Sequence, residues 1–387
     1  MNNDLTVAQD IQSLFAANAA QDDFLQAGKL EDTIGLCLSG GGYRAMIYHV
    51  GALIRLNELG FLPHLAEVAS VSGGSITAGL LALRWPALRF DEDGRAVNLD
   101  PLFVSPLLRF AGNGIDIKAA FYGLLPGCSA GDSLVRAYDR HLFEGACLQD
   151  ITDSPRFTFM ATNLQTGSGW RFGKSYAADY RVGLIDRPVI PLARVVAASS
   201  AFPPILSPVR VDLSGEYVRA TAGADLHRAP FTKTAVLADG GIYDNLGLER
   251  VWKRCRTILV SNAGRTMPEV GRPSGRWIGQ MFRTLGLIQQ QAEHSRRRIL
   301  FGMANTRQRQ VAYWSIDAAS THYALSDALP LAADEAVAAA SLRTRLNPFS
   351  LEEQRLLLRA GYAGADASLR ARGMAQNSPA ACYDFLP

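Results

Sequence analysis

The chain has 387 residues, of which 48% are hydrophobic and 19% are charged. It is too apolar for a disordered protein and long enough to bury one large core or two smaller ones. The net charge of +3 indicates no partner by itself, and we expect no nucleic-acid ligand. No uncharged apolar run approaches the roughly 18 residues of a membrane-spanning helix. The first thirty residues do not resemble a secretory signal, so we expect a cytoplasmic protein.

The cysteines are odd in number, widely scattered and never in CxxC spacing. This pattern argues against both a disulfide framework and a zinc site. We expect reduced and mostly buried thiols, and no metal or organic cofactor. The five are Cys37, Cys128, Cys147, Cys255 and Cys382.

Short apolar runs bounded by Gly, Asn or Asp predict strands, and helical spacing between the first two runs predicts a helix that ends near Gly60. Strand, helix and strand within about forty residues form a βαβ unit. We therefore predict an α/β fold with a mainly parallel central sheet and helices on both faces. The predicted strands are 34–38, 67–71, 157–163, 235–239, 257–262 and 311–317, and the later helices are 190–201, 246–254, 277–301 and 352–372.

We expect three regions: an N-terminal helical extension at 1–32, a catalytic core at 33–265, and a C-terminal helical region with one strand at 266–387, packed on the core. The stretches near 86–155 and 205–233 are rich in Pro, Gly and Asp and lack clear periodicity, which indicates insertions over the sheet edge. Within the first, residues 104–127 are unusually apolar. Buried packing is favoured there over a lid or lipid-facing surface.

Residues 39–45 read SGGGYRA, with a predicted strand before them and a predicted helix after. They satisfy the GxGxxA pattern of dinucleotide-binding folds, which also requires an acid at the tip of the second strand. That tip carries Ser72 followed by two glycines instead. A Walker phosphate loop is excluded because no Lys followed by Ser or Thr closes the motif.

The second cluster, SVSGGS at residues 70–75, fits a nucleophile on a sharp strand-to-helix turn. Gly73 and Gly74 permit the crowded turn, and the helix after it directs its amides and its positive end at what Ser72 attacks. The pattern departs from GxSxG at Ser70. In a parallel sheet the neighbouring tips lie side by side, so the amides of Gly41 and Gly42 can form an oxyanion hole.

A serine hydroxyl needs a base. Asp239 ends another apolar strand in AVLADGGIYDNLGLE, two glycines leave room around it, and a helix should begin near Asp244 or Asn245. No histidine lies at a strand tip in a distinctive motif, and surface or structural roles are favoured for all six. They are His49, His64, His141, His227, His294 and His322.

SGGGYRA, SVSGGS and ADGG, in this order, resemble the three signatures of bacterial patatin-like phospholipases. The resemblance spans about residues 33–255 and includes ATN (161–163) and AASSAFPP (197–204), which look like packing elements of the family. It implies a three-layer α/β/α sandwich and a fatty-acyl ester substrate, usually a glycerophospholipid. It also implies a dyad and an oxyanion site, namely Ser72 as nucleophile, Asp239 as base, and Gly40, Gly41, Gly42, Arg44 and Gly73 around the oxyanion.

The expected activity is a phospholipase A or lysophospholipase, acting as a serine acyl hydrolase at a phospholipid or membrane surface, including the inner face of the membrane. Two alternatives stay open. One is an α/β-hydrolase triad of Ser72, Asp239 and either His294 or His322. The other is a non-catalytic or nucleotide-gated lipid-binding effector on the same fold.

Residues 251–310 hold twelve Lys or Arg and only two acids, Glu269 and Glu293. A solvated basic face is the favoured interpretation, and a surface for anionic lipid or nucleotide phosphates is the alternative. Some bacterial patatin-like proteins are effectors switched on by cyclic nucleotides, so the span also raises a nucleotide activator as a hypothesis. The helix at 280–300 suits either a homo-oligomer contact or a membrane surface.

Overall fold

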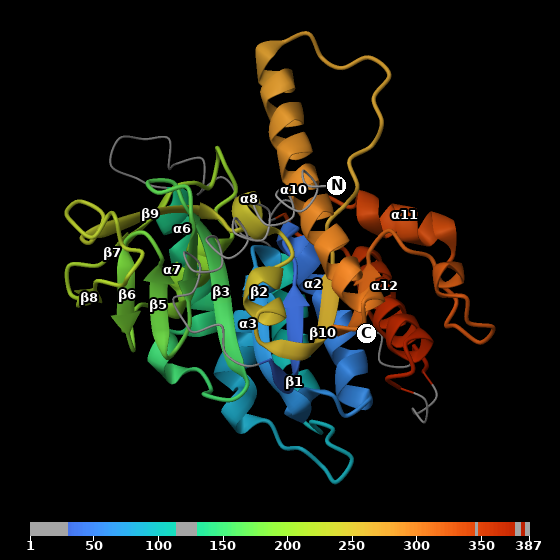
Figure 1. Ribbon diagram of the computed structural model, residues 1–387. Helices are drawn as coiled ribbons and strands as arrows, with labels where there is room; N and C mark the ends of the chain where they lie inside the picture. Colours follow the sequence, from blue (N-terminus) through green and yellow to red (C-terminus); the bar gives the residue numbers. More distant parts are fainter. Residues whose placement is uncertain (1–29, 114–129, 345–346, 376–380, 384–387) are drawn as a thin grey trace, which may run out of the picture.

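The computed structural model of the protein describes residues 30–113, 130–344, 347–375 and 381–383. A single mixed sheet runs through the molecule, and helices cover both of its faces (Figure 1). The strand order is β11-β10-β1-β2-β3-β4-β5-β6-β8, and β9 pairs with both β3 and β7. The strands are β1 (Glu31–Leu38), β2 (Leu65–Val71), β3 (Arg156–Asn163), β4 (Gly169–Phe172), β5 (Tyr176–Asp179), β6 (Gly183–Asp186), β7 (Val209–Asp212), β8 (Val218–Arg219), β9 (Thr234–Asp239), β10 (Cys255–Asn262) and β11 (Gln310–Ser315).

The centre of the sheet is parallel. β11, β10, β1, β2 and β3 pair in parallel with one another in that order, whereas the other strand pairings among the described residues are antiparallel. The last four residues of β1 and the last five of β2 are fully buried, as expected for strands covered on both faces. The predicted parallel sheet is therefore confirmed in the centre, and the antiparallel half from β4 to β8 is an addition that the sequence did not predict.

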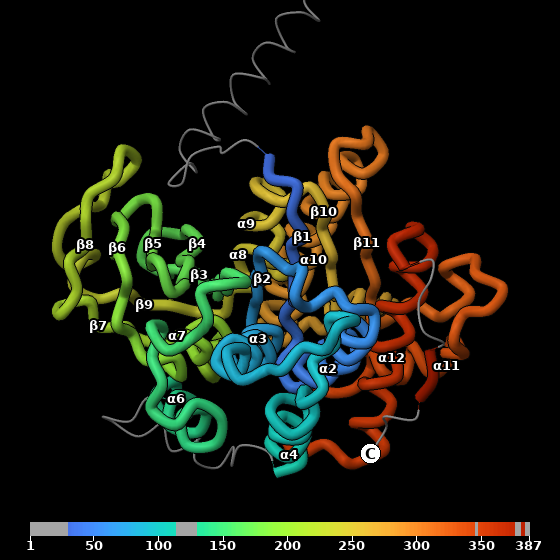
Figure 2. The backbone as a smooth tube through the Cα atoms, turned by 90° about the horizontal axis from the view of Figure 1, so that it is seen from below, coloured from blue at the N-terminus to red at the C-terminus, as the bar shows by residue number. Residues whose placement is uncertain are grey.

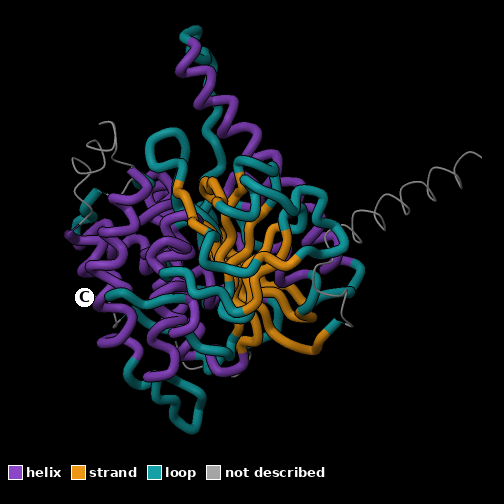
Figure 3. The backbone as a smooth tube through the Cα atoms, turned by 90° about the vertical axis from the view of Figure 1, so that its left-hand side faces the viewer, coloured by secondary structure: helices purple, strands orange, loops and turns teal. Residues whose placement is uncertain are grey.

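Two helical layers enclose this sheet (Figure 2). On one face α2, α3, α7 and α12 pack over the larger apolar core, and on the other α8, α9 and α10 cover a smaller one. Figure 3 shows the strands between the helices. The helices are α2 (Gly42–Glu58), α3 (Gly73–Arg84), α4 (Ser105–Asn113), α6 (Ala130–Tyr138), α7 (Leu192–Ser199), α8 (Gly241–Asp244), α9 (Leu248–Trp252), α10 (Trp277–Asn305), α11 (Ala333–Ser341) and α12 (Leu351–Ala371).

All six predicted strands and all four later helices are present within a few residues of their predicted bounds. The helix expected near Asp244 begins earlier, at Gly241, and is followed by the separate α9. The C-terminal region does more than pack on the core, because β11 extends the parallel sheet and α12 lies along α2. Of the N-terminal extension, residues 1–29 lie outside the described residues, and Glu31 and Asp32 belong to β1.

The two predicted insertions lie in different places. The stretch 205–233 supplies β7 and β8 at the antiparallel end of the sheet, as expected of an edge insertion. The stretch 86–155 instead packs on the helical layer, with α4 against α2 and α6 against α7. Of the apolar segment 104–127, residues 104–113 contribute buried side chains such as Leu107 and Phe110, and the rest lies outside the described residues.

Four of the five cysteines lie in the described residues, and none of these four forms a disulfide. Cys37 and Cys255 are buried, Cys147 is half-buried and Cys382 is exposed. None of the helices within the described ranges combines the length and the apolar composition needed to cross a bilayer.

Candidate active site

Ser72 sits on a strained turn between β2 and α3. Its backbone angles, φ 52° and ψ −122°, lie outside the regions that L-residues ordinarily occupy. Such a conformation costs on the order of 1–3 kcal/mol and persists only where the surroundings enforce it. Here the amide of Ser72 donates to Ser199 Oγ at 3.0 Å, and its carbonyl accepts from the amide of Ser75 at 2.8 Å. The nucleophile turn expected from SVSGGS is thus present in its geometry.

The glycines after Ser72 are required because other backbone lies against them. A Cβ on Gly73 would collide with the carbonyl oxygen of Gly42, and one on Gly74 would collide with that of Leu38. The start of α3 therefore touches the start of α2. The two glycine clusters, about thirty residues apart in the chain, form one continuous surface around Ser72.

We predict that Gly73→Ala lowers kcat/KM for ester hydrolysis, because the added methyl group separates α3 from the glycine loop. The expected decrease is about 10²–10³-fold, which is the effect of losing one oxyanion donor. Gly302→Ala is the matched control, since a Cβ there meets nothing within 4 Å. Steady-state kinetics on a soluble ester measure both. Wild-type activity in Gly73→Ala would show that the contact has no catalytic importance.

β3 brings Asp239 to Ser72. Val71 pairs with Met160 of β3, and Asp239 pairs with the next residue, Ala161. Ala161 also pairs with β4 on the far side of β3, so β9 must occupy the same side as β2. β2 and the antiparallel β9 therefore meet end to end along one edge of β3. Ser72, the residue after β2, and Asp239, the last residue of β9, are therefore brought together.

The Asp239 carboxyl group is buried, with 2% of the residue exposed. Its Oδ1 accepts the amide of Gly241 at 2.7 Å, and its Oδ2 has no hydrogen-bond partner among the described residues. Burial raises the pKa of Asp239 to about 6, while the nearby Ser72 hydroxyl and the Gly241 amide act to lower it. The hydroxyl is thus close enough to affect the carboxyl group without forming a hydrogen bond of standard geometry. The free Oδ2 is a suitable proton acceptor.

The glycine loop offers amides at the start of α2. Gly41 and Gly42 have φ of 144° and 60°, a region that favours glycine. The first amides of α2 and α3 have no intrahelical partner and lie at the positive end of each helix. The amide of Gly40 is already used, because it donates to the carbonyl of Asn245 at 3.0 Å. The amides that remain for an oxyanion are those of Gly41, Gly42 and Gly73.

Arg44 directs its guanidinium group away from Ser72. Nη1 donates to the carbonyls of Ala340 and Leu342 at 2.6 and 3.2 Å, and Nη2 donates to that of Ala263 at 2.8 Å. Burial, with a smaller contribution from Arg265, lowers the pKa of Arg44 to about 10. Its side chain therefore joins the start of α2 to the C-terminal region. Only its backbone amide remains near the glycine loop.

Several residues that hold the site together were not singled out from the sequence. Ser199 Oγ accepts from Ser72, exchanges a hydrogen bond with Ser75 Oγ at 2.8 Å and donates to the Met160 carbonyl at 2.6 Å. Its own carbonyl accepts the amide of Gly240 at 3.0 Å. Ser199 thus connects the nucleophile turn to the Asp239 turn. The AASSAFPP motif was the available signal, and its predicted packing role is observed.

The other packing motif, ATN, fixes the aspartate strand. Thr162 Oγ1 donates to the carbonyl of Asp239 at 2.8 Å.

Ser39, which follows β1, accepts the amide of Ala263 on Oγ at 2.8 Å, and its carbonyl lies 2.9 Å from His49 Nε2. Burial lowers the pKa of His49 to about 4, so its ring is neutral and serves to hold this end of the sheet.

No histidine hydrogen-bonds Ser72 or Asp239 in the described part of the chain. His322 is exposed in a short 3-10 turn (Ser320–Tyr323), and its ring contacts Tyr323. His294 lies half-buried on α10. The alternative triad with either histidine therefore gains no support from the structure.

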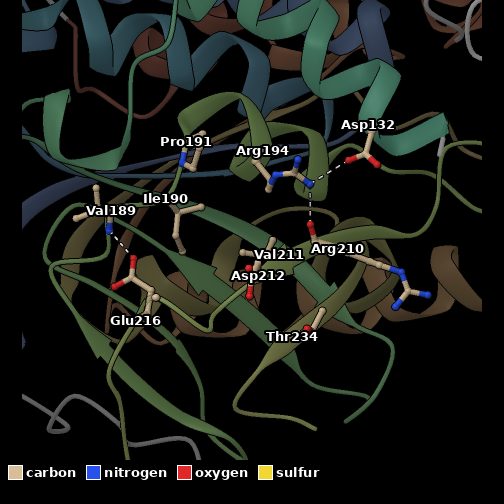
Figure 4. Close-up of a pocket in the computed structure, with 11 residues that line it drawn as sticks. Asp132, Val189, Ile190, Pro191, Arg194, Arg210, Val211, Asp212, Glu216 and Thr234 are labelled. Carbon is tan, nitrogen blue, oxygen red and sulfur yellow. Dashed lines mark hydrogen bonds and ion pairs between the residues drawn. The ribbon is translucent and has the colours of Figure 1, made fainter. Parts of the chain in front are cut away.

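A pocket of about 690 Å³ lies elsewhere, between α6, the loop before α7 and β7 (Figure 4). Neither Ser72 nor Asp239 lines it. Two of its charged side chains have partners: Arg194 donates to Asp132 at 3.1 Å, and Glu216 accepts the amide of Val189 at 2.7 Å. We assign no chemistry to this pocket.

Within the described ranges, no group of three or more His, Cys, Asp or Glu side chains could hold a metal ion.

A family model described as patatin-like phospholipase matches residues 36–252, more than half of the chain. The chain belongs to this family. Membership makes it a relative of lipid hydrolases, and it agrees with the three motifs and with the fold. No curated protein sequence is significantly similar to the chain.

Among solved structures, human GIVD cytosolic phospholipase A2 is similar, with 13% sequence identity and a TM-score of 0.50. The alignment covers 89% of this patatin-like chain and 60% of the human chain. VipD from Legionella pneumophila has 16% identity and a TM-score of 0.39, with 89% and 67% of the two chains covered. At these identities, the human structure supports the fold alone.

Proposed function

We propose that the protein is a serine acyl hydrolase that cleaves fatty-acyl esters of glycerophospholipids, as a phospholipase A or lysophospholipase. One observation carries the proposal: Ser72, on its strained turn, faces the buried Asp239, whose Oδ2 has no other partner among the described residues. A nucleophile next to a desolvated carboxylate with a raised pKa is an arrangement suited to proton abstraction near neutral pH.

The proposed reaction has two halves. Asp239 Oδ2 accepts the proton of Ser72 Oγ while Oγ attacks the ester carbonyl carbon, and the amides of Gly41, Gly42 and Gly73 stabilise the resulting oxyanion. The C–O bond to the alcohol then breaks, and Asp239 returns the proton to the leaving oxygen. In the second half, Asp239 takes a proton from water while the water oxygen attacks the acyl carbon. The bond between that carbon and Ser72 Oγ then breaks, Asp239 returns the proton to Oγ, and the fatty acid is released. Neither half requires a metal or an organic cofactor.

The proposal is tested by labelling the protein with a fluorophosphonate and mapping the adduct by mass spectrometry. We expect one adduct, at Ser72, and none in Asp239→Asn at the same exposure. Incubation with mixed lipids should then release free fatty acid and lysophospholipid from wild type only. A protein that takes no label and releases no fatty acid would instead be the non-catalytic lipid-binding member that the sequence left open.

The remaining expectations stay predictions. They are a bacterial origin, a cytoplasmic location with contact at the inner face of the membrane, a nucleotide activator and a homo-oligomer. At least four basic residues of the span 251–310 form ion pairs with acids in the described part of the chain. These are Lys253 with Glu249, Arg254 with Glu31, Arg256 with Asp32 and Arg296 with Asp244.

A further inference from the structure

The outer half of α10, residues 277–288, projects from the body of the molecule (Figures 1 and 3). It carries large apolar side chains that the protein leaves uncovered. The exposed fractions are 74% for Trp277, 50% for Ile278, 45% for Met281, 43% for Phe282 and 62% for Ile288. At about 100° per residue these five lie within an arc of about 140° and form one face of the helix, whereas Leu287, which is 40% exposed, lies about 80° outside that arc. A contiguous exposed apolar face of this kind indicates an interaction surface.

The charges around this face are almost all positive. Residues 266–288 contain Arg272, Arg276 and Arg283 against the single acid Glu269. Arg272, Arg276 and Arg283 form no ion pair with any described residue, unlike the paired basic residues near β10. A second copy of the chain would bring an identical set of arginines to the same surface. An apolar helix face with uncompensated arginines beside it is instead complementary to an anionic lipid surface.

The inner half of α10 is attached to the proposed active site. Gln289 Nε2 donates to the carbonyl of Gly241 at 3.1 Å. Glu293 accepts from Asn245 at 3.0 Å and from Asn262 at 2.9 Å. The helix thus contacts the turns after Asp239 and after β10, and its apolar tip extends about 18 Å beyond them at 1.5 Å per residue. A bilayer that receives the tip would therefore lie on the site's side of the molecule.

We propose that the outer half of α10 is a docking element that inserts Trp277, Ile278, Met281 and Phe282 into the interface of an anionic membrane. The flanking arginines contact the lipid headgroups. The proposal rests on the proposed function for its purpose, which is to hold the lipid hydrolase site at its substrate. The docking itself is measured without turnover.

Trp277 is a built-in reporter. Of the five tryptophans, Trp85, Trp170 and Trp314 are at most 9% exposed and Trp252 is half-buried, so the fluorescence difference between wild type and Trp277→Phe reports on the helix tip. In a Ser72→Ala background, vesicles of phosphatidylcholine with phosphatidylglycerol should shift the Trp277 emission to the blue, and brominated lipid should quench it. Phosphatidylcholine alone should do so much less.

Co-sedimentation with the same vesicles measures affinity. Replacing Trp277 and Phe282 together by serine should weaken partitioning at least about tenfold, and Arg272→Gln with Arg276→Gln about fivefold per residue. Tyr217→Ser is the matched control, because Tyr217 is 80% exposed on the opposite, antiparallel part of the sheet and should leave partitioning unchanged. With Ser72 restored, the α10 variants should hydrolyse a soluble ester normally and vesicle phospholipid poorly.

Unchanged Trp277 emission on adding anionic vesicles, or wild-type sedimentation of the serine double variant, would overturn the proposal. A dimer seen by light scattering would also overturn it, if Trp277 were buried in that dimer without lipid and the serine double variant were monomeric. The apolar face of α10 would then bind a second copy of the chain. Vesicle binding with no hydrolysis of any ester would refute the proposed function and leave the docking element in place. Hydrolysis of vesicle phospholipid that is unchanged in the α10 variants would refute the docking element and leave the proposed function in place.

Discussion

Replacing Ser72 by alanine is expected to lower kcat for ester hydrolysis by at least about 10⁴-fold, the scale on which hydrolases lose activity without their nucleophile. The amides around the site would still bind an ester, but no acyl-enzyme would form. The fold should persist, since the hydrogen bonds that hold the turn are made by the amide and carbonyl of residue 72, to Ser199 Oγ and from the Ser75 amide.

Burst kinetics with a chromogenic ester measure this effect, with Ser200→Ala as the control. Ser200 is a buried neighbour whose hydroxyl bonds Val196 and Tyr138 instead of the site. We expect an acyl-enzyme burst in the control and none in Ser72→Ala. A comparable burst in both variants would assign the nucleophile to another residue.

The second large effect is expected for Asp239→Asn, which should abolish hydrolysis and at the same time stabilise the protein above neutral pH. Asparagine can keep the hydrogen bond from the Gly241 amide through its side-chain oxygen. Its NH₂ group donates rather than accepts, so it cannot take the proton of Ser72. Activity should fall by about 10⁴-fold, as with other members of hydrolase dyads and triads.

The sign of the stability change follows from the pKa of Asp239, which burial raises from 3.8 to about 6. Between these values the native state binds more protons than the unfolded state, so the free energy of unfolding decreases as pH rises through this window. Ionisation of the buried carboxyl group lowers the free energy of unfolding by about 3 kcal/mol, and this loss is complete above about pH 7. Asparagine carries no charge, so the variant should gain up to this amount at pH 8 and nothing below about pH 4.

Urea unfolding at pH 4 and pH 8 measures this difference for wild type and variant. The same ionisation should appear in catalysis, because Asp239 acts only as a carboxylate. We expect kcat/KM of the wild type to rise with pH and to level off above an apparent pKa near 6. An Asp239→Asn protein that hydrolyses esters normally, or that is less stable at pH 8 than wild type, contradicts the assignment of Asp239 as the buried base.

The parts of the site that the sequence predicted share one property: each depends on local geometry. Gly73 and Gly74 indicate a tight turn wherever it lies, and Ser72 between an apolar strand and a helix marks a nucleophile turn. The same holds for the central strands, because a continuous apolar run indicates a strand that is buried on both faces of the sheet. A single strand or turn carries this information in consecutive residues.

Other features depend on residues far apart in the chain. The sequence suggested Asp239 at the tip of a core strand, but it did not show that β9 runs antiparallel and meets β2 end to end along β3. It grouped Arg44 with the oxyanion, whereas the guanidinium group reaches carbonyls nearly 300 positions away. It treated 251–310 as one basic span, which the structure divides into paired residues near β10 and unpaired ones at the tip of α10.

The sequence by itself therefore determined the α/β class, the three motifs and their family, because spacing along the chain encodes strands, helices and turns. Only the tertiary structure decided how the motifs meet, which amides remain free and which charges stay unpaired. These depend on where β3, Ser199 and α10 place distant backbone groups. Hydrogen bonds and burial between elements settle that arrangement, and no single segment of the sequence contains them.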